Sequence, residues 1–296
     1  MHEMGGAHPE SPERLDAISD QLLASGMINL LLTVDTVVPA SYEALARVHT
    51  SDYLARLERD SPTTGLYEID PDTAMNPHTL SAAKYAAGAL VQAVDAVMEG
   101  KSTTAFCAVR PPGHHATRSQ AMGFCFYNNI AVAAAHALAE HGLKRVAIID
   151  FDVHHGNGTE SIFSGDDRVL MCGFFQHPLY PNSGLDYPAA NMVNIPVPAY
   201  TTGSTIRELV SEHWLPRLEA HAPEMVFVSA GFDAHREDDM AQLALVESDY
   251  AWMTEQIMAV AERHAQNRVV SALEGGYNLS ALARSVVAHL RALARI

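Results

Sequence analysis

The sequence has 296 residues, of which 48% are hydrophobic and 18% charged, enough to bury a large core. One large α/β domain or two small ones would fit this length, but no linker-like stretch favours two, so we expect one domain over residues 1–296. With 19 basic and 35 acidic residues, the formal charge of −16 argues against nucleic acid as a partner and mildly favours cationic substrates such as lysine-rich tails or polyamines.

Apolar runs and cysteines bear on the compartment. Charges or histidines interrupt every apolar run well short of the roughly 20 residues that a transmembrane helix needs, so no membrane partner is expected. The three cysteines form no CxxC pair and predict reduced, buried thiols in a cytoplasmic protein.

The first hundred residues are predicted to be helical, with no strand before the first helix. Helical patterns cover 11–26, two short segments within 40–59, and 77–99. Ser11 as N-cap and Pro12 at the first position would begin the first helix, and Gly26 would end it. Thr50 or Ser51 would cap the second short helix, and the many alanines of the long helix would let it pack closely.

Strand-like and helical segments alternate from residue 103 onwards. The runs that read as strands are 103–109, 145–150, 168–172, 192–197, 225–230 and 268–273. The helical segments between or after them are 128–141, 203–220, 248–265 and 279–295. This alternation predicts an α/β fold in which helices cover both faces of a mostly parallel central sheet.

Polar segments follow four of the predicted strands. They read RPPGHHATRSQAMGF, DFDVHHGNG, GFDAHRED and EGGYN. Ligands of such sheets bind beyond the carboxyl ends of the strands. Each segment alone is weak evidence, but four of them at one edge of a sheet indicate a functional site.

The segment after the second predicted strand offers half of a metal site. Side chains two apart share a face, so Asp150, Asp152 and His154 would line one side of the chain as it leaves the sheet. Carboxylate and imidazole suit Zn²⁺ or another borderline divalent ion, although Asp-x-His at a strand end is often ordinary loop chemistry. Asp233, after the fifth predicted strand, is the best candidate for a third ligand, with capping of the next helix as the alternative.

Candidate proton-transfer groups lie in the same segments. The loop that carries His114 and His115 could bring both rings to the ion, with one ring oriented by Asp150 and the other by Asn157. A neighbouring carboxylate raises the pKa of a histidine, so the ring linked to Asn157 would be the better general base, and we assign this role to His115.

Tyr277 is a candidate for stabilising an oxyanion. It follows Gly275 and Gly276, whose flexibility could let its hydroxyl turn toward the developing charge. The alternative is an aromatic ring that packs at the end of a loop.

The motifs together resemble a known family. PPGHHA (111–116), GFCFYNN (123–129), DFDVHHGNGT (150–159), SAGFDAH (229–235) and EGGYN (274–278), with HPESPERL (8–15) before them, resemble the zinc-dependent histone deacetylase family. The sequence of these motifs is similar to that of class II-like bacterial deacetylases and the related acetylpolyamine amidohydrolases. The resemblance extends from His2 to the last predicted helix.

This resemblance implies an arginase/deacetylase-type α/β sandwich and a reaction. The reaction would be hydrolysis of the amide of N-ε-acetyl-lysine or a related acylated amine. The implied site has Zn²⁺ on Asp152, His154 and Asp233, a catalytic pair of His114 and His115, and Tyr277 polarising the amide carbonyl. These roles agree with those argued from the residues.

The resemblance also implies a tunnel for the acyl-lysine side chain and a second ion. Phe124 and Tyr180 would wall the tunnel, Gly123 would give room in it, and Met240 would stand at its mouth, with Gly275 beside the substrate. A K⁺ ion would be bound by Asp150 and by the backbone of Asp152 and His154.

The sequence departs from the family pattern at three places. The usual strand before the first histidine-containing loop is missing or the sequence is trimmed, so we expect a sheet edge that is exposed or covered by another chain, as in a homo-oligomer. Gly173 stands where a serine hydroxyl normally binds K⁺. Met240 stands where a Glu marks polyamine preference in relatives, which argues against strict polyamine specificity.

Two other functions remain alternatives at this point. A non-catalytic acyl-ligand binder could keep the tunnel, although every catalytic position holds the residue type that the chemistry needs. An arginase-like dinuclear manganese hydrolase would share the fold, but the residues after Asp233 lack the Asp-x-Asp pattern for a second ion. The sequence does not choose among proteins, polyamines and small metabolites as substrate.

Overall fold

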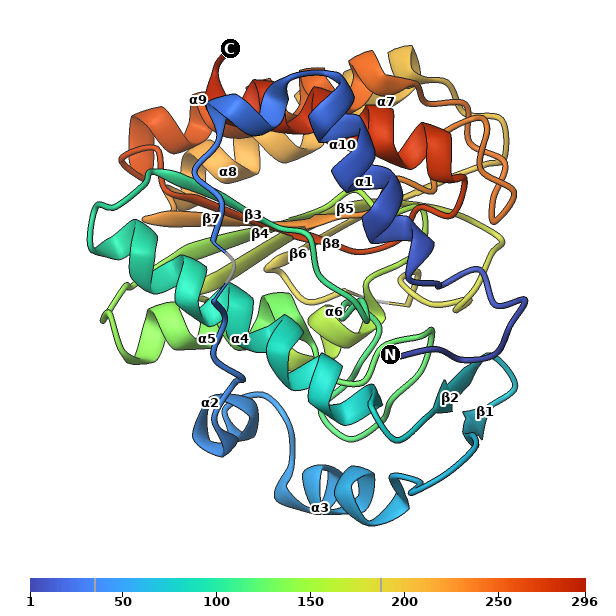
Figure 1. Cartoon of the computed structure of the whole chain (residues 1–296). Helices are drawn as coiled ribbons and strands as arrows, with labels where there is room; N and C mark the ends of the chain where they lie inside the picture. The colour runs from blue at the N-terminus through green and yellow to red at the C-terminus, as the bar shows by residue number, and fades with distance from the viewer. Residues whose placement is uncertain (35, 187) are drawn as a thin grey trace.

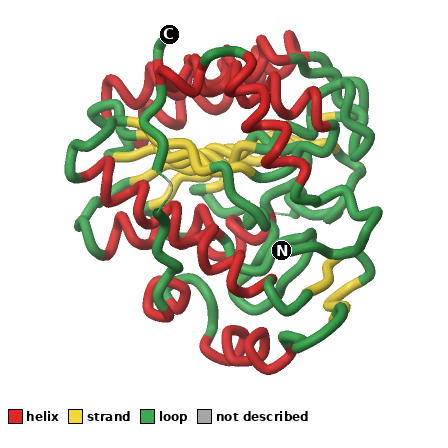
Figure 2. Tube along the Cα trace, in the orientation of Figure 1, coloured by secondary structure: helices red, strands yellow, loops and turns green. Residues whose placement is uncertain are grey.

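A six-stranded, wholly parallel sheet forms the centre of the computed structural model, which describes residues 1–34, 36–186 and 188–296 (Figures 1 and 2). Its spatial order is β3 (Thr104–Cys107), β8 (Val269–Leu273), β7 (Met225–Ala230), β4 (Val146–Asp150), β5 (Val169–Gln176) and β6 (Met192–Val197). All six coincide with predicted strands, so the predicted α/β fold with a parallel sheet is confirmed.

Helices cover both faces of the sheet, as Figure 1 shows. One face carries α1 (Glu13–Ala24), α7 (Gly203–Leu209), α8 (Leu215–His221), α9 (Glu247–His264) and α10 (Leu279–Ala294). The other carries α4 (Thr79–Met98) and α5 (Asn129–Ala139), with α2 (Tyr42–Ala46), α3 (Ser51–Asp60) and α6 (Asn157–Phe163) near them. A hydrophobic core lies on each face of the sheet, and strand β4 contributes to both. Val146 and Ile148 pack on the α4 side, whereas Ala147 and Ile149 pack on the α9 side. This explains why its sequence is a continuous apolar run.

Several elements were not predicted. Strands β1 (Tyr67–Asp70) and β2 (Thr73–Met75) form a small antiparallel hairpin, and a 3₁₀ turn, η1 (Met27–Leu30), follows the first helix. A π-helical segment, η2 (Val210–Trp214), interrupts the helix predicted at 203–220. Helix α6 begins inside DFDVHHGNG, the polar segment after the second predicted strand. Each of these elements is short, so tertiary contacts decide its conformation more than local sequence does.

The helix ends match the prediction in part. Thr50 caps α3 by accepting a hydrogen bond from the N–H of Tyr53, as predicted (3.3 Å). The prediction that Ser11 caps α1 is wrong: Pro12 occupies the N-cap position and makes no side-chain cap. The backbone carbonyl of Ser11 accepts the N–H of Arg14 instead (3.2 Å), so the first turn closes through the main chain.

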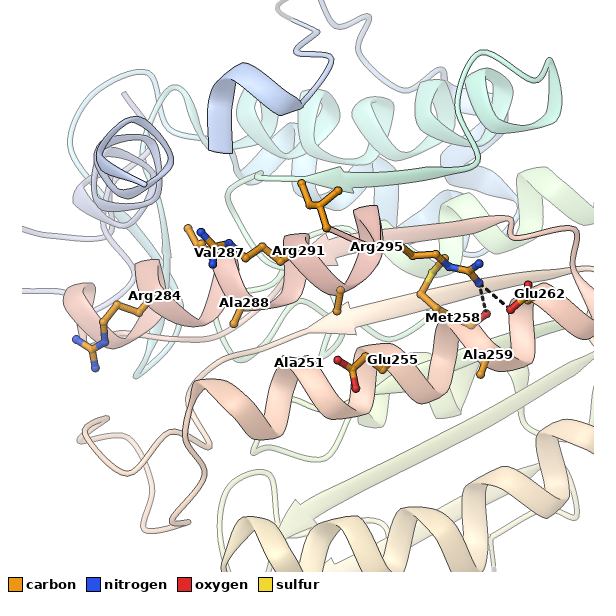
Figure 3. Close-up of a pocket in the computed structure, with 12 residues that line it drawn as sticks. Ala251, Glu255, Met258, Ala259, Glu262, Arg284, Val287, Ala288, Arg291 and Arg295 are labelled. Atoms are coloured by element: carbon orange, nitrogen blue, oxygen red, sulfur yellow. Dashed lines mark hydrogen bonds and ion pairs between the residues drawn. The ribbon is translucent and has the colours of Figure 1, made fainter. Parts of the chain in front are cut away.

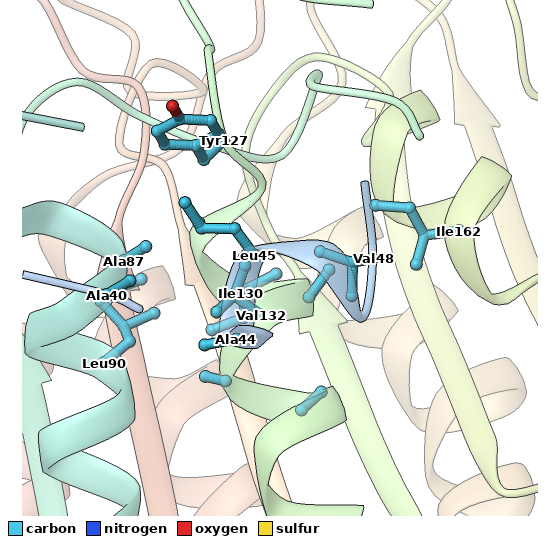
Figure 4. Packing of buried hydrophobic residues seen from close by; sticks show 14 of the residues in the cluster. Ala40, Ala44, Leu45, Val48, Ala87, Leu90, Tyr127, Ile130, Val132 and Ile162 are labelled. Carbon is cyan, nitrogen blue, oxygen red and sulfur yellow. The ribbon is translucent and has the colours of Figure 1, made fainter. Parts of the chain in front are cut away.

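Helix α4 packs closely against the segment before α2, as its small residues predicted. A Cβ atom on Gly88 would clash with the carbonyl of Val38 and would lie 2.7 Å from the N of Ala40. Figure 4 shows Ala40, Ala87 and Leu90 meeting in the core on this side of the sheet. The backbone of 38–40 therefore lies directly on the helix.

Two further expectations concern compartment. All three cysteines are buried free thiols, as predicted: Cys107, Cys125 and Cys172. Across the described ranges, no helix is both long and apolar enough to span a lipid bilayer.

Candidate active site

The candidate site lies where the strand order reverses. From β4 the chain adds β5 and β6 on one side, then returns to place β7 on the other side of β4. A crevice beyond the strand ends forms at such a reversal. Asp152 follows β4 and Asp233 follows β7, and these two strands are direct neighbours. The topology therefore brings together two segments that are far apart in the sequence, as in the pair Val153 and Asp233, which are 80 residues apart.

Backbone hydrogen bonds join the loops at this edge. The N–H of Gly275, after β8, donates to Oδ2 of Asp152 (2.8 Å), and the N–H of Val153 donates to Oδ1 of Asp233 (2.9 Å). The N–H groups of Gly113 and His114 donate to one carboxylate oxygen of Glu274 (2.6 and 3.1 Å). All four polar segments predicted to meet at one edge therefore do so.

Asp152, His154 and Asp233 form a buried group that we call the metal triad. Nδ1 of His154 lies 3.1 Å from Oδ1 of Asp152 and 3.1 Å from Oδ2 of Asp233. Potential ligand atoms of the three residues all lie within 4.8 Å of one another, and the residues are only 1%, 7% and 1% exposed. Two carboxylates and an imidazole are a donor set that suits a borderline divalent cation.

The electrostatics of the triad also fit a cation. Burial and the charge of Asp152 raise the pKa of Asp233 to about 6. Burial opposes the charge on His154, but its hydrogen bonds with Asp152 and Asp233 outweigh burial and raise its pKa to about 10. A dication among these groups would relieve the repulsion between the two carboxylates. The packing leaves little freedom, because a Cβ on Gly275 would lie 2.6 Å from Oδ2 of Asp152 and would clash with Asp233.

Two histidines with different partners stand beside the triad. His114 Nδ1 lies 3.0 Å from Oδ2 of Asp150, His115 Nδ1 lies 2.7 Å from Oδ1 of Asn157, and the ring centroids are 4.0 Å apart. Burial opposes protonation of His114, but the Asp152 and Asp150 carboxylates outweigh it and hold its pKa well above the usual value. Burial and the charges of the neighbouring histidines hold the pKa of His115 well below the usual value.

Aromatic rings border these histidines. The ring of Tyr180 is edge-on to His115, with centroids 5.2 Å apart, and Phe124 lies 5.9 Å from Tyr277. Gly123 has φ of +55°, and a Cβ there would lie 2.8 Å from Cγ of His115. Only glycine suits this position, because both its backbone conformation and its close approach to the ring exclude a side chain.

Asp238 holds the turn that carries Tyr277. Its Oδ2 accepts hydrogen bonds from the N–H groups of Tyr277 (2.6 Å) and Asn278 (2.9 Å), and its Oδ1 accepts one from Met240 (3.0 Å). Burial raises the pKa of the Tyr277 hydroxyl well above its usual value, so the phenol keeps its proton. The place of Met240 at the tunnel mouth stays a prediction.

Sequence reasoning missed three residues that support the site. Besides Asp238, these are Glu274, a buried carboxyl whose pKa burial raises to about 7, and Arg14. The guanidinium of Arg14 donates to the carbonyls of Glu274 (2.5 Å) and Gly276 (2.7 Å) and lies 4.9 Å from the ring centre of Tyr277. Signals for both were available: Glu274 directly follows an apolar strand, and Arg14 lies in the HPESPERL motif (8–15).

Two residues close to the metal triad in sequence or in the sheet, His155 and Gly173, have other contacts. His155, the neighbour of the triad residue His154, hydrogen-bonds Glu160 and Ser183 (2.8 Å each). Gly173 pairs with Asp150 across β4 and β5 and offers no side-chain hydroxyl there.

A separate groove of about 760 Å³ lies between α9 and α10 (Figure 3). Its lining comes from these two helices and the C-terminal residues, including Met258, Arg291 and Arg295. It includes no residue of the four polar loops and contributes nothing to the candidate site.

Comparisons with known proteins agree with this fold. A model of the histone deacetylase domain matches residues 8–293. The histone deacetylase-like amidohydrolase of Pseudomonas aeruginosa is 37% identical over 278 residues, which are 92% of this chain and 73% of that protein. The polyamine deacetylase HDAC10 of Homo sapiens is 36% identical over 295 residues, 94% of this chain and 43% of that protein. The crystal structure of the HDA15 HD domain matches with a TM-score of 0.93 and 32% identity, covering 99% of this chain and 86% of that one. The chain therefore belongs to the histone deacetylase family, as its motifs indicated.

Proposed function

We propose that this protein is a zinc-dependent deacetylase that hydrolyses the amide of N-ε-acetyl-lysine or a related acylated amine and releases acetate and the free amine. The observation that carries the proposal is the buried metal triad beside two histidines with different hydrogen-bond partners. When bound, Zn²⁺ would polarise the amide carbonyl and lower the pKa of the attacking water.

The two histidines would share the proton transfers. Nδ1–H of His115 donates to Oδ1 of Asn157, which leaves Nε2 with a lone pair to take a proton from water. Its lowered pKa keeps this ring neutral. His114 stays charged beside Asp150 and could give a proton from Nε2 to the departing amine. Each ring thus begins the reaction in the protonation state that its role needs.

The remaining residues would bind and orient the substrate. Tyr277 would donate a hydrogen bond from its hydroxyl to the oxyanion, with Gly275 beside the acyl group. Phe124 and Tyr180 would wall the channel for the acyl-lysine chain, and Gly123 would leave room beside His115. Excluding water from this channel strengthens each of these interactions.

We also propose a K⁺ ion and a cytoplasmic location. Asp150 and the backbone carbonyls of Asp152 and His154 would bind the K⁺, without the usual serine because Gly173 replaces it. The three buried free thiols support a reducing compartment.

Acetylated polyamines are the competing substrate class. The name of the human relative favours them, while Met240 in place of a glutamate favours acetyl-lysine, and the formal charge of −16 suits both classes. A competition panel of acetyl-lysine peptides, acetylputrescine and longer acyl-lysines separates these classes by kcat/KM. The higher kcat/KM identifies the preferred class.

The zinc-dependent activity is tested with a fluorogenic acetyl-lysine amide. We expect hydrolysis by the wild-type protein, loss of hydrolysis with a chelator, and recovery when Zn²⁺ is restored. Asp233→Ala should lose both bound zinc and activity, because it removes one ligand and leaves two. Hydrolysis that persists in the presence of the chelator and in Asp233→Ala would contradict the proposed mechanism, and a folded, zinc-loaded, inactive protein would indicate a non-catalytic binder.

A further inference from the structure

A second cluster of ligand-type side chains lies at the opposite edge of the sheet from the candidate active site. Asp95 lies in the last turn of α4, His136 in the last turn of α5, and His141 just beyond that helix. Helix α5 begins beside the active-site loops, where the side chain of Asn128 donates to the carbonyl of Ala116 (3.1 Å). Its 11 residues then carry the chain about 16 Å away at 1.5 Å per residue, so this cluster is distinct from the metal triad.

Both imidazoles point the same nitrogen at one carboxylate. Oδ1 of Asp95 lies 2.7 Å from Nε2 of His136 and 2.7 Å from Nε2 of His141. The planes of the two rings are inclined at 76°, so they approach Asp95 from different directions. Three ligand atoms from two helices and a loop thus converge on one point, within 4.8 Å of one another.

The exposure of the cluster suits an ion with an open coordination position. The side chains of His136, His141 and Asp95 are 11%, 22% and 42% exposed. Nδ1 of His136 is buried and has no hydrogen-bond partner within the described part of the chain. Because no protein donor opposes a proton on Nδ1, this ring can carry its proton there and offer the lone pair of Nε2 to a cation.

The local charges favour a cation. Burial opposes ionisation of Asp95, but the hydrogen bonds from His136 and His141 hold its pKa below the usual value, so it is an anion at neutral pH. The C-terminal ends of α4 and α5 meet here, and their dipoles add negative potential. Lys101, which follows α4, is paired with Glu99 (2.5 Å).

We propose that Asp95, His136 and His141 form a second metal site for a borderline divalent cation of the Zn²⁺ type. Nε2 of each histidine and one carboxylate oxygen would be the protein ligands, and water would complete the coordination on the exposed side. Each ring would move its proton from Nε2 to Nδ1. For tetrahedral bonds of about 2.0–2.1 Å, the ligand atoms must separate from 2.7 Å to about 3.3 Å, a small side-chain adjustment. The ion would tie the ends of α4 and α5 together.

The test is the number of zinc ions bound per chain after equilibrium dialysis against Zn²⁺. His141→Ala should bind one zinc fewer than wild type, with unchanged amide hydrolysis. His264→Ala is the matched control, because His264 is also a half-buried histidine paired with a carboxylate at a helix end (Glu219, 2.7 Å) but has no second histidine ligand. It should bind the wild-type number of ions.

The comparison measures a difference, so it does not depend on whether the metal triad holds zinc. Equal stoichiometry in His141→Ala and wild type overturns the second site, as does an equal loss in His264→Ala. Asp95→Asn provides an independent variant of similar size that should also lose one ion. Circular dichroism checks folding, and if His141→Ala does not fold, Asp95→Asn decides the question by the same criteria.

Discussion

The pKa values of two adjacent histidines, His114 and His115, are shifted in opposite directions, and the two rings have different hydrogen-bond partners. His114 and His115 are both buried, and their rings are 4.0 Å apart. A carboxylate, Asp150, faces the first, and an amide, Asn157, faces the second. A carboxylate stabilises the charged imidazolium far more than an amide does. Together with the charge of Asp152 near His114 and the burial of His115, this difference in partner separates the proposed acid from the proposed base.

Asn157→Asp tests this assignment by changing the partner of His115. The added negative charge raises the pKa of His115, so the ring becomes protonated over more of the pH range and cannot act as a base there. We expect the acidic limb of the pH–activity profile to move to higher pH, with lower activity at pH 7. Asn29→Asp adds the same charge at an exposed position and should leave the profile unchanged. An unshifted limb in Asn157→Asp would show that His115 is not the base.

Tyr277→Phe removes one hydroxyl and keeps the ring between Phe124 and Arg14. If the hydroxyl donates to the oxyanion, kcat should fall about 10²–10³-fold, because single oxyanion donors contribute on this scale. Bound zinc should remain, since Tyr277 is not in the metal triad. Activity and zinc content measured on the same preparation separate the two effects, and wild-type turnover in the variant would remove Tyr277 from the mechanism.

At the scale of elements, the sheet was predictable largely because its four inner strands, β8, β7, β4 and β5, are buried along their whole length. Such strands are apolar runs that stop where they leave the core, and β4 with the following Asp152 shows this change directly. The hairpin β1–β2 was not predicted, since the apolar–polar alternation of β1 extends over only four residues and none of them is fully buried. Helix α6 begins with Asn157-Gly158, a sequence typical of turns, yet the N–H of Gly158 bonds the carbonyl of His114 (3.1 Å). A contact distant in sequence decides its structure.

In the candidate site, too, some residues could be predicted from local sequence whereas others depend on contacts that are distant in sequence. Asp152, His154 and Asp233 could be proposed because they directly follow strands, where the fold places ligands. Glu274 and Asp238 act by accepting backbone N–H groups from distant loops. Any residue can supply a backbone N–H, so the sequence of the partner loop gives no sign of such a contact.

Gly88→Ala tests the close packing of α4. In an exposed helix this change would be stabilising, because alanine has the higher helix propensity. Here the added methyl would clash with the carbonyl of Val38, which is backbone and moves only with its whole segment. We expect a loss of about 1–3 kcal/mol in the free energy of unfolding from urea denaturation. Gly6→Ala, where a methyl meets open space, should change stability little; a stabilised Gly88→Ala would contradict the packing.

Over the whole molecule, polar groups are buried in two different ways. Those at the carboxyl edge of the sheet converge on a point that suits a cation, whereas His49 and His289 are held neutral within the cores. His49 donates Nδ1–H to the carbonyl of Thr117 (2.9 Å) and accepts the N–H of Asn128 at Nε2 (3.0 Å). If Nε2 were protonated, its N–H would face the backbone N–H of Asn128, and two donors would oppose each other. Burial accordingly lowers the pKa of His49 to about 4.

His289 is the more deeply buried case and makes the acid stability of the fold testable. Its side chain is fully buried between α9 and β8, bonded to Thr254 (2.7 Å) and Ser271 (2.9 Å), and burial lowers its pKa to about 3. In the unfolded chain its pKa is about 6.5. Between these values the unfolded state binds a proton that the folded state does not, so this histidine lowers the free energy of unfolding as pH falls from 6.5 toward 3. The slope reaches about 1.4 kcal/mol per pH unit.

His289→Gln should therefore reduce the pH dependence of stability between pH 6.5 and 4, even if it lowers stability at pH 7. The amide can replace both hydrogen bonds but cannot bind the proton. His78→Gln, at an exposed position before α4, serves as the control and should keep the wild-type slope. Urea unfolding at half-unit pH steps measures the three slopes. Equal slopes for wild type and His289→Gln would mean that His289 is not neutral in the fold, whereas a smaller slope in His289→Gln alone assigns part of the acid sensitivity of the whole molecule to this one buried ring.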